Sequence, residues 1–202
     1  MSETTAGVTR NPIIGQRKVG STGFPMPNID VKIVDIATGT IEMPIGESGE
    51  IIVKGVTVMK GYWKEPEETE NAIRDGWLHT GDIGKMDRDG YFYIVGRKKE
   101  LIITGGFNVY PAEVEEVIYQ HPAVLEVGVY GVPDTYRGEA VKAAIVIKKG
   151  ATSSAEEIQN WCRERLTRYK VPRIIDFRDS LPKTAVGKIL RRQLKDEDED
   201  EM

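Results

Sequence analysis

The chain has 202 residues, 40% of them apolar, and a net charge of −4. This length suits one large globular domain or two small ones, and no run approaches the roughly 18 apolar residues of a transmembrane helix. Met1-Ser2-Glu3 begins no signal peptide and Cys162 is the single cysteine, which excludes an internal disulfide framework, so we expect a soluble, cytoplasmic protein.

Charge divides the chain into three regions. Residues 1–97 carry 11 Lys and Arg against 14 Asp and Glu, whereas residues 98–195 carry 17 against 12, a net charge of +5. Such an excess suits an anionic partner, although an ordinary solvated surface gives the same pattern. The acidic run at 196–201 has no apolar residue to bury, so a disordered tail is predicted over 196–202.

The first half of the chain is predicted to be rich in strands. Residues 2–10 are expected to form a loop. Between Arg17 and Lys60, β-branched runs alternate with glycine-containing turns, which indicates a small β-rich subdomain. Acidic residues around Pro66 then predict a short helix. The chain has two histidines, neither with partners at the spacing of metal ligands, so no zinc site is predicted.

A β-hairpin is predicted at the junction of the two halves. Strands at 84–86 and 91–95 flank Asp89-Gly90, a pair that suits the positive φ angles of a tight turn. Asp82 then lies at the entry of the hairpin and Arg97 at its exit. Such a pair can hold vicinal hydroxyls or a phosphate, because the carboxylate accepts and the guanidinium donates hydrogen bonds. A purely structural salt bridge is the alternative.

The second half alternates predicted helices and strands. Pro111 begins a helix with Ile118 on its apolar face and Glu113, Glu115 and Glu116 mostly outside. Ser154 and Glu157 form a candidate capping box for a helix to about Arg168. Strands are predicted at 124–132, 141–147 and 173–177, which together give a compact α+β domain over residues 98–195.

Two glycine-containing segments are candidates for ligand binding. Gly105-Gly106 lets the backbone approach a ligand or turn sharply, and a simple loop is the alternative. Gly187-Lys188 is not a phosphate-binding Walker loop, because the earlier glycine is missing and Ile189 replaces the usual Ser or Thr. A lysine on such a loop can still approach a phosphate as a point charge before the basic helix predicted at 189–195.

Five motifs span almost the whole chain: SETT at 2–5, TGD at 80–82, GR at 96–97 with KKELI after it, GGFNVYPAEVEEVI at 105–118 and YKVPRIIDFRDSLPKTAVGKILRR at 169–192. They resemble the adenylate-forming superfamily of acyl-CoA synthetases, luciferases and peptide-synthetase adenylation domains. Within it, FNVYPAEVEEVI and LPKTAVGKILRR are most similar to long-chain fatty acyl-CoA synthetases.

The resemblance implies a two-step reaction with ATP, Mg²⁺, a fatty acid and coenzyme A. A carboxylate attacks the α-phosphate of ATP, and the thiol of coenzyme A then displaces AMP. By resemblance, Lys188 is the catalytic adenylation lysine. The other implied roles are nucleotide binding by Ser2, Asp82 and Arg97, a Mg²⁺ ligand in Glu3, a hinge at Lys99, and a coenzyme A tunnel lined by Gly105 and Gly106.

The resemblance also implies an α+β fold in two parts. Residues 1–97 match the β-rich end of a large N-terminal domain, and residues 98–195 match a mobile C-terminal domain joined by a hinge. The family's phosphate loop, adenine pocket and fatty-acid tunnel lie upstream of the SETT motif, so we expect a C-terminal fragment that is inactive without the N-terminal part of the enzyme.

Three other functions remain as alternatives. One is a freestanding module that binds a nucleotide or coenzyme A without catalysis, although such a module would not require Lys188. Another is a peptide-synthetase adenylation domain. Nucleic-acid binding, suggested by Arg191-Arg192, is disfavoured because no aromatic residues are interleaved with the basic ones.

Overall fold

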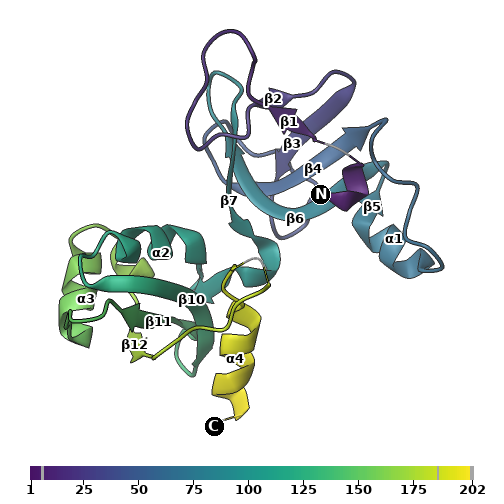
Figure 1. Cartoon of the computed structure of the whole chain (residues 1–202). Coiled ribbons are helices and arrows are strands. Elements are labelled where there is room, and N and C mark those ends of the chain that lie inside the picture. The colour runs from purple at the N-terminus through teal and green to yellow at the C-terminus, as the bar shows by residue number, and fades with distance from the viewer. Residues whose placement is uncertain (6, 186, 201–202) are drawn as a thin grey trace. The chain divides into compact units, whose positions relative to one another are not determined.

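The computed structural model describes residues 1–5, 7–185 and 187–200. The chain divides into two compact units, Met1–Lys99 (unit 1) and Glu100–Met202 (unit 2), each with its own sheet (Figure 1). The short 3-10 helix η2 (Lys98–Glu100) covers the point of division. In the described part of the chain, no helix has the length and apolar character needed to cross a membrane.

Unit 1 is built on a five-stranded antiparallel sheet. The strand order is β3-β4-β6-β5, and β7 pairs with residues 82–86 of β6, of which Ile83 and Gly84 also pair with β4. Branched residues of β3 and β4 pack with Phe92 of β7 in one core. The elements are η1 (Ser2–Thr4), β1 (Thr9–Arg10), β2 (Phe24–Pro25), β3 (Ile29–Val34), β4 (Gly49–Gly55), α1 (Pro66–Ala72), β5 (Ile73–Arg74), β6 (Trp77–Met86) and β7 (Phe92–Arg97).

The predicted hairpin is confirmed as β6 and β7. The Asp87 amide donates to the Tyr91 carbonyl at 2.9 Å, and Gly90 has a φ of 82°, in the left-handed region that glycine adopts without strain. The Lys18 ammonium lies 2.5 Å from Asp87 and 2.6 Å from Asp89, and its hydrogen bond lowers the pKa of Asp87 to about 2. The turn is therefore fixed to a preceding loop.

Unit 2 contains a second five-stranded sheet. The order is β10-β11-β8-β9, and β12 pairs in parallel with β11. The predicted strands after residue 123 are confirmed, with the long antiparallel pair β10–β11 at the centre. The elements are β8 (Ile102–Thr104), β9 (Phe107–Val109), α2 (Pro111–Tyr119), β10 (Val124–Asp134), β11 (Gly138–Ile147), α3 (Ala155–Arg163), η3 (Arg168–Lys170), β12 (Ile174–Phe177) and α4 (Arg191–Asp200).

Both faces of the unit 2 sheet are covered. Alternate residues of β10, such as Val127 and Val129, pack against α2 and α3, whereas Tyr130 and Val132 belong to a second core with Leu194 of α4. This alternation follows the two-residue period of a strand. It explains why β10 and β11 read as continuous apolar runs rather than as polar and apolar residues in turn.

Two details of the predicted helices in unit 2 are wrong. The capping box of Ser154 and Glu157 is present, but α3 ends at Arg163. The Cys162 carbonyl accepts from both the Arg165 and the Leu166 amides in a last turn, and the backbone is extended at Thr167, with a ψ of 147°. Glu115, predicted to lie mostly outside, is only 8% exposed and accepts a hydrogen bond from the Val129 amide.

The predicted disordered tail is also wrong for the described residues. Helix α4 continues through Asp200, and Asp198 is buried, while residues 201 and 202 lie outside the described part of the chain. The Asp198 carboxylate lies 2.7 Å from Lys142 Nζ and accepts from the Tyr130 hydroxyl at 2.8 Å. Burial, followed by this hydrogen bond, raises the pKa of Tyr130. The sheet therefore supplies the partners that an isolated acidic segment lacks.

We expect Asp198→Ala to destabilise unit 2 by about 3 kcal/mol, because it leaves Lys142 and Tyr130 without their main partner in a buried position. Hydrogen exchange of the β10 and β11 amides measures this loss. Asp196→Ala is the matched control, since Asp196 is 61% exposed and lies 3.8 Å from Arg192. Equal exchange rates in the two variants would contradict the anchoring role of Asp198.

Candidate functional site

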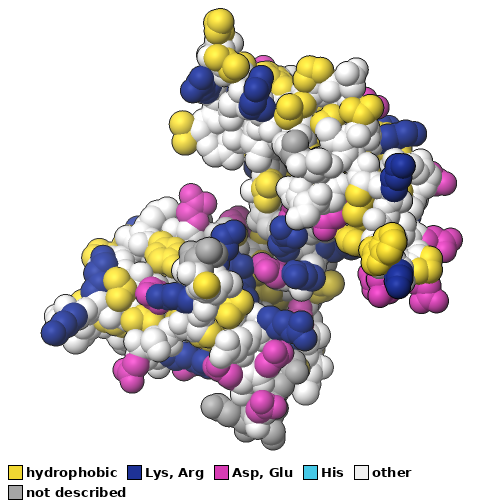
Figure 2. Space-filling view, turned by 45° about the vertical axis from the view of Figure 1, so that its right-hand side comes forward, with side chains coloured by type: hydrophobic (Ala, Val, Ile, Leu, Met, Phe, Trp, Pro, Cys, Tyr) yellow, Lys and Arg dark blue, Asp and Glu magenta, His cyan; other side chains and the backbone are white. Residues whose placement is uncertain are grey.

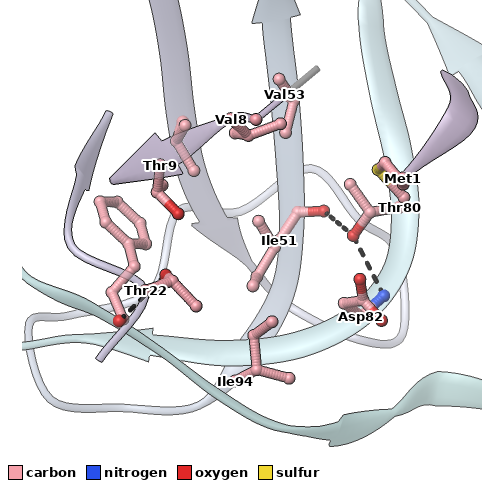
Figure 3. Close-up of a pocket in the computed structure, with 12 residues that line it drawn as sticks. Met1, Val8, Thr9, Thr22, Ile51, Val53, Thr80, Asp82 and Ile94 are labelled. Carbon is pink, nitrogen blue, oxygen red and sulfur yellow. Dashed lines mark hydrogen bonds between the residues drawn. The ribbon is translucent and has the colours of Figure 1, made fainter. Parts of the chain in front are cut away.

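Asp82 and Arg97 lie opposite each other at one end of the β6–β7 hairpin. The strand register pairs the two residues directly, and Arg97 Nε lies 2.6 Å from Asp82 Oδ1. Asp82 is 17% exposed and Arg97 is 50% exposed. The Asp82 amide donates to Thr80 Oγ1 at 3.0 Å, and that hydroxyl donates to the Ile51 carbonyl at 2.7 Å (Figure 3). The predicted proximity is confirmed, and nucleotide binding by the pair stays a prediction.

A buried carboxylate supports the turn that precedes Asp82. Glu50 of β4 is 2% exposed, and its Oε1 accepts from the Gly81 amide at 3.2 Å. Its Oε2 lies 2.8 Å from Lys98 Nζ and 3.4 Å from His79 Nδ1. Burial raises the pKa of Glu50, but the Lys98 ammonium and the other donors outweigh it, so the net pKa is lowered.

The N-terminal segment and Asp82 reach the same cavity of unit 1. A cavity of about 150 Å³ is lined by Met1, Thr80 and Asp82 together with apolar side chains such as Ile51 and Val53 (Figure 3). This wall is apolar on the β4 side and polar at the Thr80–Asp82 turn. Met1, at the start of the chain, therefore lines the same cavity as Asp82 of the Asp82–Arg97 pair.

Ser2 and Glu3 form part of η1 rather than the expected loop. The Glu3 backbone carbonyl accepts from the Met59 amide at 2.8 Å, and the Glu3 carboxylate accepts from the Tyr62 hydroxyl at 3.3 Å. Among the described residues, no group of three or more His, Cys, Asp or Glu side chains gathers at one point. Magnesium is commonly held by one or two carboxylates plus substrate phosphates, so a single Glu3 fits such a role.

A second, open hollow lies around the end of the hairpin. It has a volume of about 370 Å³ and is lined by Thr80, Gly81, Arg97, Lys98 and Lys99. Arg97 and Lys99 are exposed, whereas Lys98 is held by Glu50. The hollow thus combines positive side chains with the backbone of the Gly81 turn, a lining that suits an anionic ligand.

Gly105 and Gly106 form the two-residue turn between β8 and β9. Their φ angles are 57° and 82°, and Thr104 pairs with Phe107 across the turn. Positive φ at both central positions is the requirement of a type I′ hairpin. The turn therefore explains both glycines locally. A Cβ added at either position would meet no atom within 4 Å, so the turn also has open space around it.

Lys188 lies on a small hairpin that leads into α4. Lys183 bridges Ile189, the Thr184 amide donates to the Lys188 carbonyl at 2.8 Å, and the Lys188 amide donates to Thr184 Oγ1 at 3.1 Å. Val186, within the predicted loop, lies outside the described residues. The Lys188 side chain is exposed. The backbone of this lysine is thus fixed while its ammonium can move.

The site residues divide between the units, and sequence reasoning missed those that support them. Ser2, Glu3, Asp82, Arg97 and Lys99 belong to unit 1, whereas Gly105, Gly106 and Lys188 belong to unit 2. The missed supports are Glu50 in unit 1 and Arg191 with Glu115 in unit 2. One signal for Glu50 was a single acid at the start of the apolar strand 50–53, which indicates a charge that must find a buried partner.

We expect Glu50→Gln to destabilise the chain by about 1–3 kcal/mol at pH 7, because Lys98 loses a charged, buried partner. The pKa of Glu50 is lower in the native state than its unfolded-state value of 4.5, so the ionised carboxylate stabilises the fold above pH 4.5. This stabilisation is lost as the pH falls through the native pKa. The difference between wild type and variant should therefore shrink below about pH 4.5 in urea denaturation followed over pH. Parallel pH curves would contradict it. Glu42→Gln, at an exposed pair with Lys32, is the control.

Comparison with known proteins places both units in one enzyme family. The family model for AMP-binding enzymes matches residues 1–63, and the model for the AMP-binding enzyme C-terminal domain matches residues 113–188. The chain is 55% identical over 198 residues to the long-chain-fatty-acid–CoA ligase of Bacillus subtilis, and 49% identical to the ligase of the same name from Yersinia pestis. These matches cover 98% of this chain and 35% of each relative.

Solved structures give the same result for the fold. The crystal structure of ATP-bound MatB from Rhodopseudomonas palustris is 42% identical with a TM-score of 0.91, and covers 99% of this chain and 40% of that protein. The o-succinylbenzoate CoA synthetase of Bacillus subtilis, in complex with its acyl-adenylate intermediate, is 41% identical with a TM-score of 0.85, over 96% of this chain and 40% of that protein. The chain belongs to the family of AMP-binding enzymes.

Proposed function

We propose that this chain is the C-terminal part of an ATP-dependent, AMP-forming ligase that joins a fatty acid to coenzyme A. The observation that carries the proposal is the Asp82–Arg97 pair at the end of a rigid hairpin, in a chain 55% identical to a long-chain-fatty-acid–CoA ligase. A relative crystallised with ATP and another with an acyl-adenylate support the nucleotide chemistry.

In this proposal, unit 1 holds the nucleotide. The Asp82 carboxylate accepts hydrogen bonds from the ribose hydroxyls, and the Arg97 guanidinium donates to the same sugar. Ser2 would lie near the α-phosphate, and Glu3 would hold Mg²⁺. The bound Mg²⁺ supplies positive charge to the phosphates. The orientation of the Asp82 carboxylate is fixed by the backbone of the Gly81 turn, because Glu50 accepts from the Gly81 amide and Thr80 accepts from the Asp82 amide.

Lys188 supplies the charge for the first half-reaction. When the fatty-acid carboxylate approaches the α-phosphate, negative charge gathers between two anions, and an ammonium placed there stabilises the transition state more than the separated reactants. A long, exposed lysine side chain on a fixed hairpin suits this task, because its backbone sets the location and its four-carbon stem reaches the anions.

For the second half-reaction we propose a rotation of the C-terminal domain about Lys99. The proposed domains are residues 1–97 and 98–195, and the division of the chain into compact units after Lys99 supports a hinge there. Rotation withdraws Lys188 and brings the Gly105-Gly106 turn to the coenzyme A tunnel. The open space around both glycines supports passage of a slender pantetheine chain beside the backbone.

The proposal includes contact with the rest of the ligase. The chain spans 35% of the length of the curated relatives. Unit 1 exposes large apolar side chains in the loop 11–20, with Ile14 91% exposed and Ile13 70% exposed. Figure 2 shows apolar side chains on the surface among charged ones. Apolar groups of this size are commonly covered by a partner surface, which the remaining part of the enzyme would supply.

The test is an enzyme assembled from this chain and the complementary part of the Bacillus subtilis ligase. We expect palmitate, ATP and coenzyme A to give palmitoyl-CoA, AMP and pyrophosphate, with the complementary part alone as the control. A panel of acids, with ferulate included because a feruloyl-CoA synthase is 46% identical over 178 residues, tests the fatty-acid assignment. Formation of ADP, or equal turnover without this chain, would contradict the proposal.

Lys188→Ala should lower acyl-adenylate formation by about 10²–10³-fold, the range seen when a preorganised charge-stabilising group is lost. Thioester formation from supplied acyl-adenylate should remain within about two-fold, because the lysine is withdrawn during that step. Single-turnover assays of each half-reaction separate the two effects. Lys149→Ala, at an exposed turn of the same unit, is the matched control. An equal fall in both half-reactions would contradict the division of roles.

Gly106→Val should raise the KM for coenzyme A by about ten-fold or more while leaving acyl-adenylate formation unchanged, because a branched side chain fills the space beside the turn. Gly150→Val controls for backbone strain, since Gly150 has a φ of 81° against 82° for Gly106, and both have open space around the missing Cβ. Steady-state kinetics with varied coenzyme A provide the measurement. A similar KM in both variants would remove Gly106 from the tunnel.

A further inference from the structure

One arginine at the start of α4 contacts two carboxylates from distant segments. Arg191 Nε lies 2.8 Å from Glu115 Oε1 and Nη2 lies 2.6 Å from Glu115 Oε2, which is a bidentate pair. Nη1 donates to Glu100 Oε2 at 2.7 Å. Every guanidinium nitrogen is therefore used. A planar guanidinium fixes the orientation of such contacts, which a lysine ammonium does not do.

The buried carboxylate of this cluster reaches the central strand as well. Glu115 belongs to α2, is 8% exposed, and accepts from the Val129 amide of β10 at 2.9 Å. Glu100 is the last residue of η2 and follows Lys99 directly. The Arg191 cluster thus joins α2, β10, the start of unit 2 and the start of α4 within a few ångströms.

Arg191 is three residues beyond Lys188. The intervening chain is fixed by the Leu190 amide, which donates to the Pro182 carbonyl at 2.9 Å, and by Ile189, which packs over Gly128 so closely that a Cβ there would lie 3.0 Å from it. The other arm of the hairpin is tied through the ion pair of Lys183 with Glu126. Arg191 comes directly after these contacts and adds a charged anchor on the C-terminal side of Lys188.

We propose that Arg191 is a positioning residue for adenylation, which fixes the Lys188 hairpin to Glu115 and to the hinge-adjacent Glu100. The inference rests on the proposed function, because it assigns Arg191 to the lysine of the first half-reaction. A merely structural ion pair would stabilise unit 2 without favouring either half-reaction. A positioning residue affects only the step in which Lys188 takes part, because a displacement of about 1 Å at a charge-stabilising group can cost on the order of 10²-fold in rate.

The experiment compares both half-reactions in the assembled ligase. Arg191→Met should lower acyl-adenylate formation by about 10- to 100-fold and leave thioester formation from supplied acyl-adenylate within about two-fold. Arg191→Lys should restore little of the loss, because one ammonium cannot span the contacts of the fork. Arg192→Met is the matched control, since the neighbouring Arg192 is 93% exposed and lies 3.8 Å from Asp196.

A double variant tests whether the two partners act as one unit. Glu115→Gln should reproduce the selective loss, and the Glu115→Gln, Arg191→Met double variant should lose no more than the worse single variant. Additive losses, or a fall of the same size in both half-reactions, would overturn the positioning role. If Lys188→Ala retains full adenylation, the proposed function itself fails. If Lys188→Ala abolishes it while Arg191→Met does not change it, only this inference fails.

Hydrogen exchange on the 202-residue chain gives a test that does not depend on catalysis. In Arg191→Lys, the amides of Thr184, Lys188 and Leu190 should exchange at least about ten-fold faster than in the wild type, with the β10 and β11 amides unchanged. This pattern would show that the hairpin loosens while the sheet stays folded. Unchanged exchange in the hairpin would overturn the proposal.

Discussion

Burying a carboxylate is costly unless charged groups and hydrogen-bond donors surround it, and this constraint connects the distant segments of the chain. Glu50 in unit 1 joins β4 to the Gly81 turn and to Lys98. Glu115 and Asp198 do the same in unit 2, for the start and the later turns of α4. Asp82, Arg97 and Lys188 lie within three residues of groups in these pairs, on turns and hairpins that apolar packing alone would leave loosely defined.

Much of the fold follows from patterns that are local in the sequence. Asp89-Gly90 predicts the β6–β7 turn because the conformational demand falls on the glycine itself, and Ser154 predicts its helix because the capping contacts reach only to Glu157. The errors come from long-range partners. Residues 196–200 read as disordered because nothing nearby neutralises them, yet Lys142 and Tyr130 of the sheet hold Asp198. Glu115 has the same explanation, since its partner is 76 residues away.

Only some residues of the candidate site were predicted from the sequence, and the reason differs from one residue to the next. The proximity of Asp82 and Arg97 follows from the hairpin, but a register shift between Ile83 and Gly84 brings Arg97 rather than Gly96 opposite Asp82, which the turn alone does not predict. The choice of Lys188 came from resemblance, because an exposed lysine on a loop has no distinguishing local pattern. Glu50 and Arg191 were missed, since their importance lies in contacts across elements. Gly105 and Gly106 also have a purely structural explanation, because their positive φ angles mean that the turn requires both glycines whether or not a ligand passes.

Two ion pairs on either side of Lys99 also define where a hinge can act. Lys98 is bound to Glu50 within unit 1, and Glu100 is bound to Arg191 within unit 2. Lys99 is the one residue between these two anchored neighbours, and its side chain is exposed. If the proposed rotation occurs while both pairs persist, the backbone torsions around Lys99 must absorb it. Each unit then keeps its own site geometry, because Asp82 stays with the Glu50 cluster and Lys188 stays with the Arg191 cluster. A single domain can in this way serve two half-reactions without repacking either core.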